Sequence, residues 1–143
     1  MHESAFGPIE ERTEKVLRQT HVLDLAEAGH IKPHVDSVKF CGSVVAGLSL
    51  LSDSVIRFVR ENDKACWVNA YLPRYSFYVM GGNIRFLFTH EILSNDVSFI
   101  NGVPVRKTRR ISVMCRNEPK QLPSSPPILE SLAKQWNEEK TNE

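Results

Sequence analysis

Short runs of β-branched and aromatic residues alternate with polar turns through most of this chain, and few stretches repeat with a helical period. The strand-like runs are HVLDL (21–25), VKFCGSVVAGLSLL (38–51), SVIRFVREN (54–62), CWVNAYL (66–72), YSFYVMGG (75–82), IRFLFTHEI (84–92) and RRISVMCR (109–116). Turn-forming pairs such as Gly81-Gly82 and Asn101-Gly102 separate these runs. Many short strands with few helices are typical of a β-sandwich or jelly roll, so a mainly β fold is expected.

The two ends of the chain have a different pattern. Residues 9–19 predict a short helix with a small apolar face, Val16 and Leu17, inside an N-terminal flank of residues 1–20. Four prolines between positions 119 and 127 predict an extended linker. A helix is expected from Ile128, with Leu129, Leu132 and Trp136 on one side, before a disordered tail that ends the 119–143 region. These boundaries predict one folded domain over residues 21–118.

Composition narrows the class of protein. The 143 residues are 41% hydrophobic and 24% charged, which suits one ordinary globular domain. The net charge of +1 predicts no general attraction to nucleic acid or to a membrane surface. Three cysteines without a C-x-x-C pair favour reduced thiols over disulfides or a structural zinc site. No apolar run is long enough to span a bilayer, and four glutamates near the N-terminus are atypical of a transit peptide, so the sequence as it stands predicts the cytosol.

The segment His34-Val35-Asp36 is a candidate for two thirds of a metal site. On an extended backbone, which Pro33 favours for the residue before it, both polar side chains point to the same face. His90, 54 positions after Asp36, is the candidate third ligand. Two imidazoles and one carboxylate form the facial set that suits non-haem Fe(II) and leaves coordination positions open. The alternatives are a solvated pair in a loop for His34 and Asp36, and a hydrogen-bonded core histidine for His90.

A second pattern lies on the last strand-like run. Alternation places Arg110, Ser112, Met114 and Arg116 on one face and the three residues between them on the other. If the arginine face is buried, it needs anions, and a dicarboxylate molecule would supply them in the bidentate geometry that guanidinium groups favour. The alternative is an arginine face in water with the aliphatic face packed. Periodicity alone does not separate the two.

Together, His34-x-Asp36, His90 and Arg110-x-Ser112-x-x-x-Arg116 resemble the AlkB family of Fe(II)/2-oxoglutarate dioxygenases, and within it the mitochondrial member. The stretches HVLDL, IKPHVDSVKFCG, AGLSLLS, THEIL and RRISVMCR carry the resemblance, which spans roughly residues 5–118. It implies a double-stranded β-helix, or jelly roll, with short flanking helices. It also implies that iron is held by His34, Asp36 and His90.

The resemblance further implies residues that hold the co-substrate 2-oxoglutarate. Arg110 would pair with its distal carboxylate, and Arg116 would help to hold its first carboxylate. Tyr78 matches a tyrosine whose hydroxyl reaches the co-substrate, and Ser112 would add a hydrogen bond. The alternative for Tyr78 is a barrel tyrosine anchored by one hydrogen bond. With Fe(II) and O2, the reaction would be oxidative decarboxylation to succinate, coupled to C–H hydroxylation or demethylation, and no further catalytic residue is expected.

The chain departs from the family pattern in places. Leu23-Asp24-Leu25 stands where many relatives carry an Asn-x-Tyr that contacts 2-oxoglutarate, and Ser112 and Met114 replace Asn and Thr. Only 33 residues precede His34, too few for a nucleotide-recognition lid, which weakens a base-flipping function. The basic residues of the run 106–110, namely Arg106, Lys107 and Arg109, are expected to form a solvated turn rather than a phosphate-binding surface.

The sequence therefore predicts an iron- and 2-oxoglutarate-dependent dioxygenase that acts on a protein or another non-duplex substrate. By the resemblance it would work in mitochondria, with a role in fatty acid metabolism and programmed necrosis, or in the cytosol if the short N-terminus is real. The alternatives are an RNA or nucleotide demethylase, and a binding module without catalytic activity. A cupin-like metal enzyme that does not use 2-oxoglutarate is opposed by the pair Arg110 and Arg116.

Overall fold

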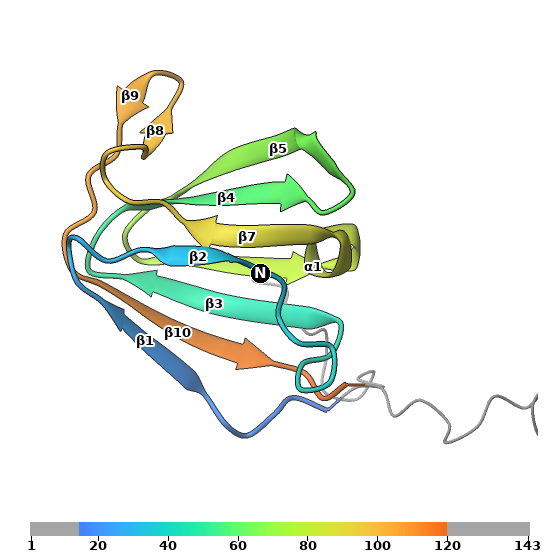
Figure 1. Ribbon diagram of the computed structural model, residues 1–143. Coiled ribbons are helices and arrows are strands. Elements are labelled where there is room, and N and C mark those ends of the chain that lie inside the picture. The colour runs from blue at the N-terminus through green and yellow to red at the C-terminus, as the bar shows by residue number, and fades with distance from the viewer. Residues whose placement is uncertain (1–14, 120–143) are drawn as a thin grey trace, which may run out of the picture.

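Two four-stranded antiparallel sheets make up most of the molecule (Figure 1). The structure is a computed structural model, and it describes residues 15–119. The first sheet has the order β1 (His21–Leu25), β10 (Arg110–Arg116), β3 (Val44–Leu50) and β6 (Ser76–Gly81). The second has the order β2 (Ile31–His34), β7 (Phe88–Ile92), β4 (Ser54–Arg60) and β5 (Asp63–Leu72). The predicted linker after Pro119 and the predicted helix from Ile128 lie outside the described residues.

The apolar core lies between the two sheets. Its buried members come from both of them: Val45 and Met80 from the first sheet, and Ile56, Leu72 and Ile92 from the second. Since side chains of a strand alternate between its two faces, the residues two positions from Ile56, Leu72 and Met80 pack against the same core, namely Phe58, Ala70 and Tyr78. Two facing antiparallel sheets are the arrangement of a jelly roll, and the prediction of a mainly β fold of this type is confirmed.

Two smaller elements join the sheets. A single short helix in the described part of the chain, α1 (Gly82–Leu87), links β6 to β7. The ribbon of β8 (Phe99–Ile100) and β9 (Val103–Pro104) projects from one end of the molecule (Figure 1). Its turn is the predicted Asn101-Gly102 pair, and both residues have a positive φ, 51° and 79°. Within residues 15–119, no helix is both long and apolar enough to cross a membrane.

Three local predictions were wrong. Residues 84–87 belong to α1, although IRFLFTHEI was expected to be one strand, because a short apolar run fits a helix as well as a strand. Residues 38–41 lie in a turn closed by bonds from the Phe40 and Cys41 amides to Ser37 O, so the strand begins only at Val44. The expected helix over 9–19 does not continue into its described part, since Val16 forms a β-bridge with Asn117.

Candidate metal centre

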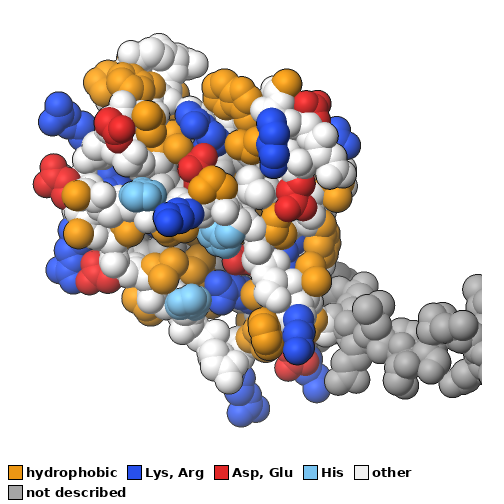
Figure 2. All heavy atoms as spheres, viewed as in Figure 1, with side chains coloured by type: hydrophobic (Ala, Val, Ile, Leu, Met, Phe, Trp, Pro, Cys, Tyr) orange, Lys and Arg blue, Asp and Glu red, His pale blue; other side chains and the backbone are white. Residues whose placement is uncertain are grey.

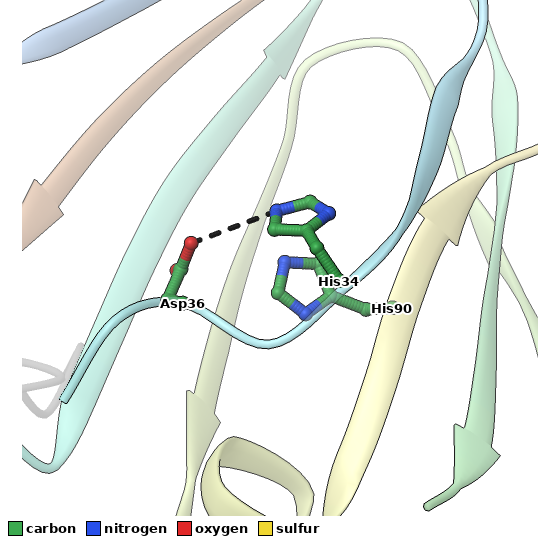
Figure 3. Close-up of side chains that lie close together, drawn as sticks. All are labelled: His34, Asp36 and His90. Carbon is green, nitrogen blue, oxygen red and sulfur yellow. Dashed lines mark ion pairs between the residues drawn. The ribbon is translucent and has the colours of Figure 1, made fainter.

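Three predicted ligand residues converge where the second sheet faces the first. His34 ends β2, Asp36 follows two residues later, and His90 lies in the middle of β7. One ligand atom from each of the three side chains lies within 4.8 Å of the other two. Figure 3 shows the two imidazole rings and the carboxylate close together, with the ion pair between His34 Nε2 and Asp36 Oδ1 at 3.6 Å. The structure therefore brings together all three residues that the sequence predicted as metal ligands.

Strand register places the two histidines side by side. β2 pairs antiparallel with β7, and His34 is the direct partner of His90 in that ladder. Their ring centroids are 4.3 Å apart. His34 Nδ1 lies 2.9 Å from Lys32 O, so a proton on Nδ1 is held by this carbonyl and Nε2 faces Asp36. Metal-binding histidines commonly use such a bond to fix the ring and its tautomer.

Burial and mutual contact set the protonation of the three side chains. Burial, with the nearby His34 as the next cause, lowers the pKa of His90 to about 4. Contact with His34 lowers the pKa of the Asp36 carboxyl, and contact with Asp36 raises the pKa of His34. At neutral pH, His90 is therefore neutral and Asp36 is ionised, so both present lone pairs to a cation. Two imidazoles and a carboxylate from neighbouring segments fit Fe(II) in its facial 2-His-1-carboxylate geometry.

The three side chains line a cavity of about 160 Å³ between the sheets. All four residues expected to hold the co-substrate also line it: Tyr78, Arg110, Ser112 and Arg116. The rest of the lining is His21 together with Leu23, Ile31, Ile56, Met80, Ile92 and Met114. Histidine side chains lie at the surface over β1 and β2, each of which is one edge strand of its sheet (Figure 2). A mainly apolar cavity with a few convergent polar groups is typical of a small-molecule site.

Arg110 is the most unusual residue of the cavity. It is 2% exposed, and its neighbours on the same face of β10, Ser112 and Met114, are buried as well. Its Nε donates to Ser49 Oγ at 3.0 Å, while Nη2 is buried without a hydrogen-bond partner. Burial lowers the pKa of the guanidinium, an effect that the Tyr78 hydroxyl opposes. The arginine face of β10 therefore points inward, and among the described residues no carboxylate forms an ion pair with Arg110.

The other three residues surround the same space. The Tyr78 hydroxyl lies 3.3 Å from Ser112 Oγ, and either atom could donate. Gly47 makes room for this ring, since a Cβ at Gly47 would lie 2.5 Å from Tyr78 Cζ. Arg116 Nε lies 4.0 Å from Asp36 Oδ2 and makes no hydrogen bond in the described residues. Both arginines of β10 therefore turn polar hydrogens toward the cavity that the candidate ligands also line.

Sequence reasoning missed the places of three polar side chains. His21 lines it from β1, with Nδ1 3.1 Å from Arg116 Nη1, and strand alternation from Leu23 could have placed it there. Arg85 is 3% exposed in α1, and no motif marked it. Lys107, expected in a solvated turn, is 1% exposed because its Nζ donates to Ala26 O and Glu27 O. That expectation was wrong for Lys107.

Known proteins support the family resemblance. No protein-family model matches the chain. It is 46% identical over 128 residues to "Alpha-ketoglutarate-dependent dioxygenase alkB homolog 7, mitochondrial" of Mus musculus, an alignment that covers 87% of this chain and 56% of the relative. The protein of the same name from Bos taurus is also 46% identical over 128 residues, with 84% and 56% covered. The chain thus spans little more than half the length of these relatives, both of which are named mitochondrial.

More distant similarities agree with the fold. "Uncharacterized protein L905" of Acanthamoeba polyphaga mimivirus is 30% identical over 87 residues, which are 61% of this chain and 41% of that protein. The solved structure of OsALKBH1 superimposes with a TM-score of 0.52 at 17% identity, covering 68% of this chain and 48% of the other. This likeness supports the jelly-roll fold. The resemblance to the AlkB family that the motifs suggested is confirmed by the sequence matches.

The lowered pKa of His90 predicts a specific loss of stability in acid. Between pH 6.5 and about 4, the unfolded chain binds a proton at His90 and the folded chain does not, so lowering the pH favours unfolding. In metal-free protein, the free energy of unfolding should fall over this range by up to about 3 kcal/mol more than in His90→Gln. Urea unfolding at several pH values measures this difference. Parallel pH profiles for the two proteins would contradict the burial of a neutral His90.

Proposed function

We propose that this chain carries the catalytic core of an Fe(II)- and 2-oxoglutarate-dependent dioxygenase, in which His34, Asp36 and His90 hold the iron. One observation supports the proposal above all others. The buried guanidinium of Arg110, which has no anionic partner among the described residues, lines the same cavity as a two-histidine, one-carboxylate set. A cation-binding set and an anion-binding group facing one cavity suit a dicarboxylate that also chelates a metal.

Each ligand residue has a defined task in this proposal. His90 offers a neutral nitrogen, His34 offers Nε2 once a cation displaces its proton, and Asp36 offers a negative oxygen that offsets part of the charge of the cation. Bound iron supplies the chemistry that couples the decarboxylation of 2-oxoglutarate by O2 to the oxidation of a C–H bond in the substrate. The three residues that would hold the iron come from the end of β2, the segment after it and β7, and all of them line the cavity. No side chain is required to act as a general acid or base.

The arginines and hydroxyls of the cavity hold the co-substrate. Arg110 Nη2 donates to the distal carboxylate of 2-oxoglutarate, which supplies the acceptor that the guanidinium otherwise lacks. Arg116 attracts the first carboxylate from its place beside Asp36. Tyr78 and Ser112 offer hydroxyl donors from β6 and β10. The apolar remainder of the lining excludes water from the reacting groups. This demand for an anion also distinguishes the site from a cupin-like site that does not use 2-oxoglutarate.

We further propose a protein or another non-duplex molecule as the substrate. A nucleic-acid substrate requires a basic surface for its phosphates. Two residues of the basic run have other partners, because Lys107 donates to two backbone carbonyls and Arg109 forms a bidentate ion pair with Asp24. By the names of its relatives the chain acts in mitochondria. By the family resemblance alone, it would have a role in fatty acid metabolism and programmed necrosis. Demethylation of an RNA or nucleotide is the alternative.

Anaerobic titration of the purified protein with Fe(II) and then 2-oxoglutarate tests the proposal. The chelate should produce a visible metal-to-ligand charge-transfer band. The band should be absent in His34→Ala and should require much higher 2-oxoglutarate in Arg110→Met. Arg109→Met is the matched control, because Arg109 is the next residue along the chain but is exposed and paired with Asp24. If folded wild-type protein shows no band, the chain is not a dioxygenase of this type, and a binding module becomes the better account.

Arg110→Met should also affect stability and binding in opposite directions. Removing a buried cation without an anionic partner is expected to leave the ligand-free protein as stable as wild type, or more stable by about 1 kcal/mol or more. The same change should weaken 2-oxoglutarate binding by about tenfold or more, since charged hydrogen bonds contribute about 1.5–3 kcal/mol. Thermal unfolding with and without Mn(II) and 2-oxoglutarate measures both effects. A large loss of stability in the ligand-free variant would instead assign Arg110 a structural role.

A further inference from the structure

Arg85 is a buried cation whose three hydrogen bonds all go to one segment of the chain. It lies in α1 and is 3% exposed. Its Nη1 donates to Asp36 O at 2.8 Å, its Nη2 to Cys41 O at 3.1 Å and its Nε to Gly42 O at 3.1 Å. The three carbonyls belong to the turn between β2 and β3. A single guanidinium therefore forms hydrogen bonds to both ends of this turn.

Burying the charge of Arg85 costs free energy of folding, which suggests that the residue has a specific role. Among the described residues Arg85 has no ion pair, so its charge is buried with three neutral carbonyl oxygens and the Phe86 ring, 5.1 Å away, as partners. The planar fork of a guanidinium suits this task, because its donors point in fixed directions that converging carbonyls can satisfy. The turn also has bonds of its own, from the Phe40 and Cys41 amides to Ser37 O. Arg85 thus holds in place a turn that is already compact.

The position of Asp36 explains why the turn needs such an anchor. His34 is fixed by its pairing with His90, but this pair is the last one in the β2–β7 ladder. Asp36 lies beyond the end of β2, so no strand pairing sets its distance from His90. The bond from Arg85 to Asp36 O supplies that constraint directly. Arg85 is also only five positions before His90, and α1 leads straight into β7.

We propose that Arg85 is a positioning residue of the metal centre, which fixes Asp36 relative to His90 by holding the backbone at Asp36 and the turn that follows it. The inference rests on the proposed function, since it assigns Arg85 to the same iron site. Arg85 does not touch the metal or the co-substrate. It determines whether the three ligand atoms keep a geometry in which one cation can bind them all. Residues that orient metal ligands in this way typically change metal affinity by about 10–100-fold when they are replaced.

Titration with Co(II) tests this role without relying on turnover. Co(II) absorbs in the visible range with a spectrum that depends on the number and geometry of its ligands. Arg85→Met should weaken Co(II) affinity by about tenfold or more and should change the spectrum. Arg85→Lys should give intermediate values, because one ammonium group cannot reach three carbonyls in fixed directions. Amide hydrogen exchange of residues 37–42 should report the loosened turn in both variants.

Lys107→Met is the matched control. Lys107 is likewise a buried cation that holds a turn through backbone carbonyls, those of Ala26 and Glu27, but the turn it holds carries no metal ligand. Its loss should lower the melting temperature while leaving the Co(II) affinity and spectrum at wild-type values. This control therefore distinguishes a general loss of stability from the effect on Co(II) binding that is expected for Arg85→Met.

The outcomes separate this inference from the proposed function. If wild-type protein folds but binds no Co(II), the metal site fails and the role of Arg85 fails with it. If wild type binds Co(II), and Arg85→Met loosens residues 37–42 yet keeps the wild-type affinity and spectrum, Arg85 is purely structural and the inference is overturned. If Arg85→Met does not fold, wild-type affinity and spectrum in Arg85→Lys overturn it in the same way.

Discussion

The pairing of β2 with β7 is the constraint on which the candidate site depends. It sets His34 opposite His90, with ring centroids 4.3 Å apart, on the face that looks into the cavity. Because side chains alternate along a strand, a shift of one residue in this ladder would turn one imidazole to the opposite face. Asp36 follows by its two-residue spacing, provided that the backbone beyond the strand is held. The placement of the three candidate ligands therefore depends on both the local sequence and the register of the sheet.

Three buried cations in this fold differ in the partners that compensate the burial of their charge. Arg85 and Lys107 each bind backbone carbonyls and so hold turns in place. Arg110 has the Ser49 and Tyr78 hydroxyls beside it, and its Nη2 is left without an acceptor among the described residues. Since burying a charge without compensation is expensive, this difference is informative. The first two complete their bonding inside the protein, whereas Arg110 leaves room for an anion from outside, at the cavity shared with the candidate metal ligands.

Much of the site could be predicted from the sequence because it follows from strand periodicity. The two-residue spacing of His34 and Asp36 and the alternation of Arg110, Ser112 and Met114 place their side chains on common faces. Which face of β10 is buried could not be predicted, since both faces carry apolar residues. The position of Arg85 could not be predicted from the sequence, for another reason. Its run of apolar residues fitted a strand, and its partners are carbonyls that any sequence would provide.

The most direct test of the account is a crystal structure obtained without oxygen in the presence of Mn(II) and 2-oxoglutarate. Mn(II) accepts similar ligands to Fe(II) and does not turn over. The account predicts one metal ion bound by His34, Asp36 and His90, chelated by 2-oxoglutarate, with the distal carboxylate on the guanidinium of Arg110. A metal bound elsewhere, or a carboxylate that leaves Arg110 without an acceptor, would contradict it.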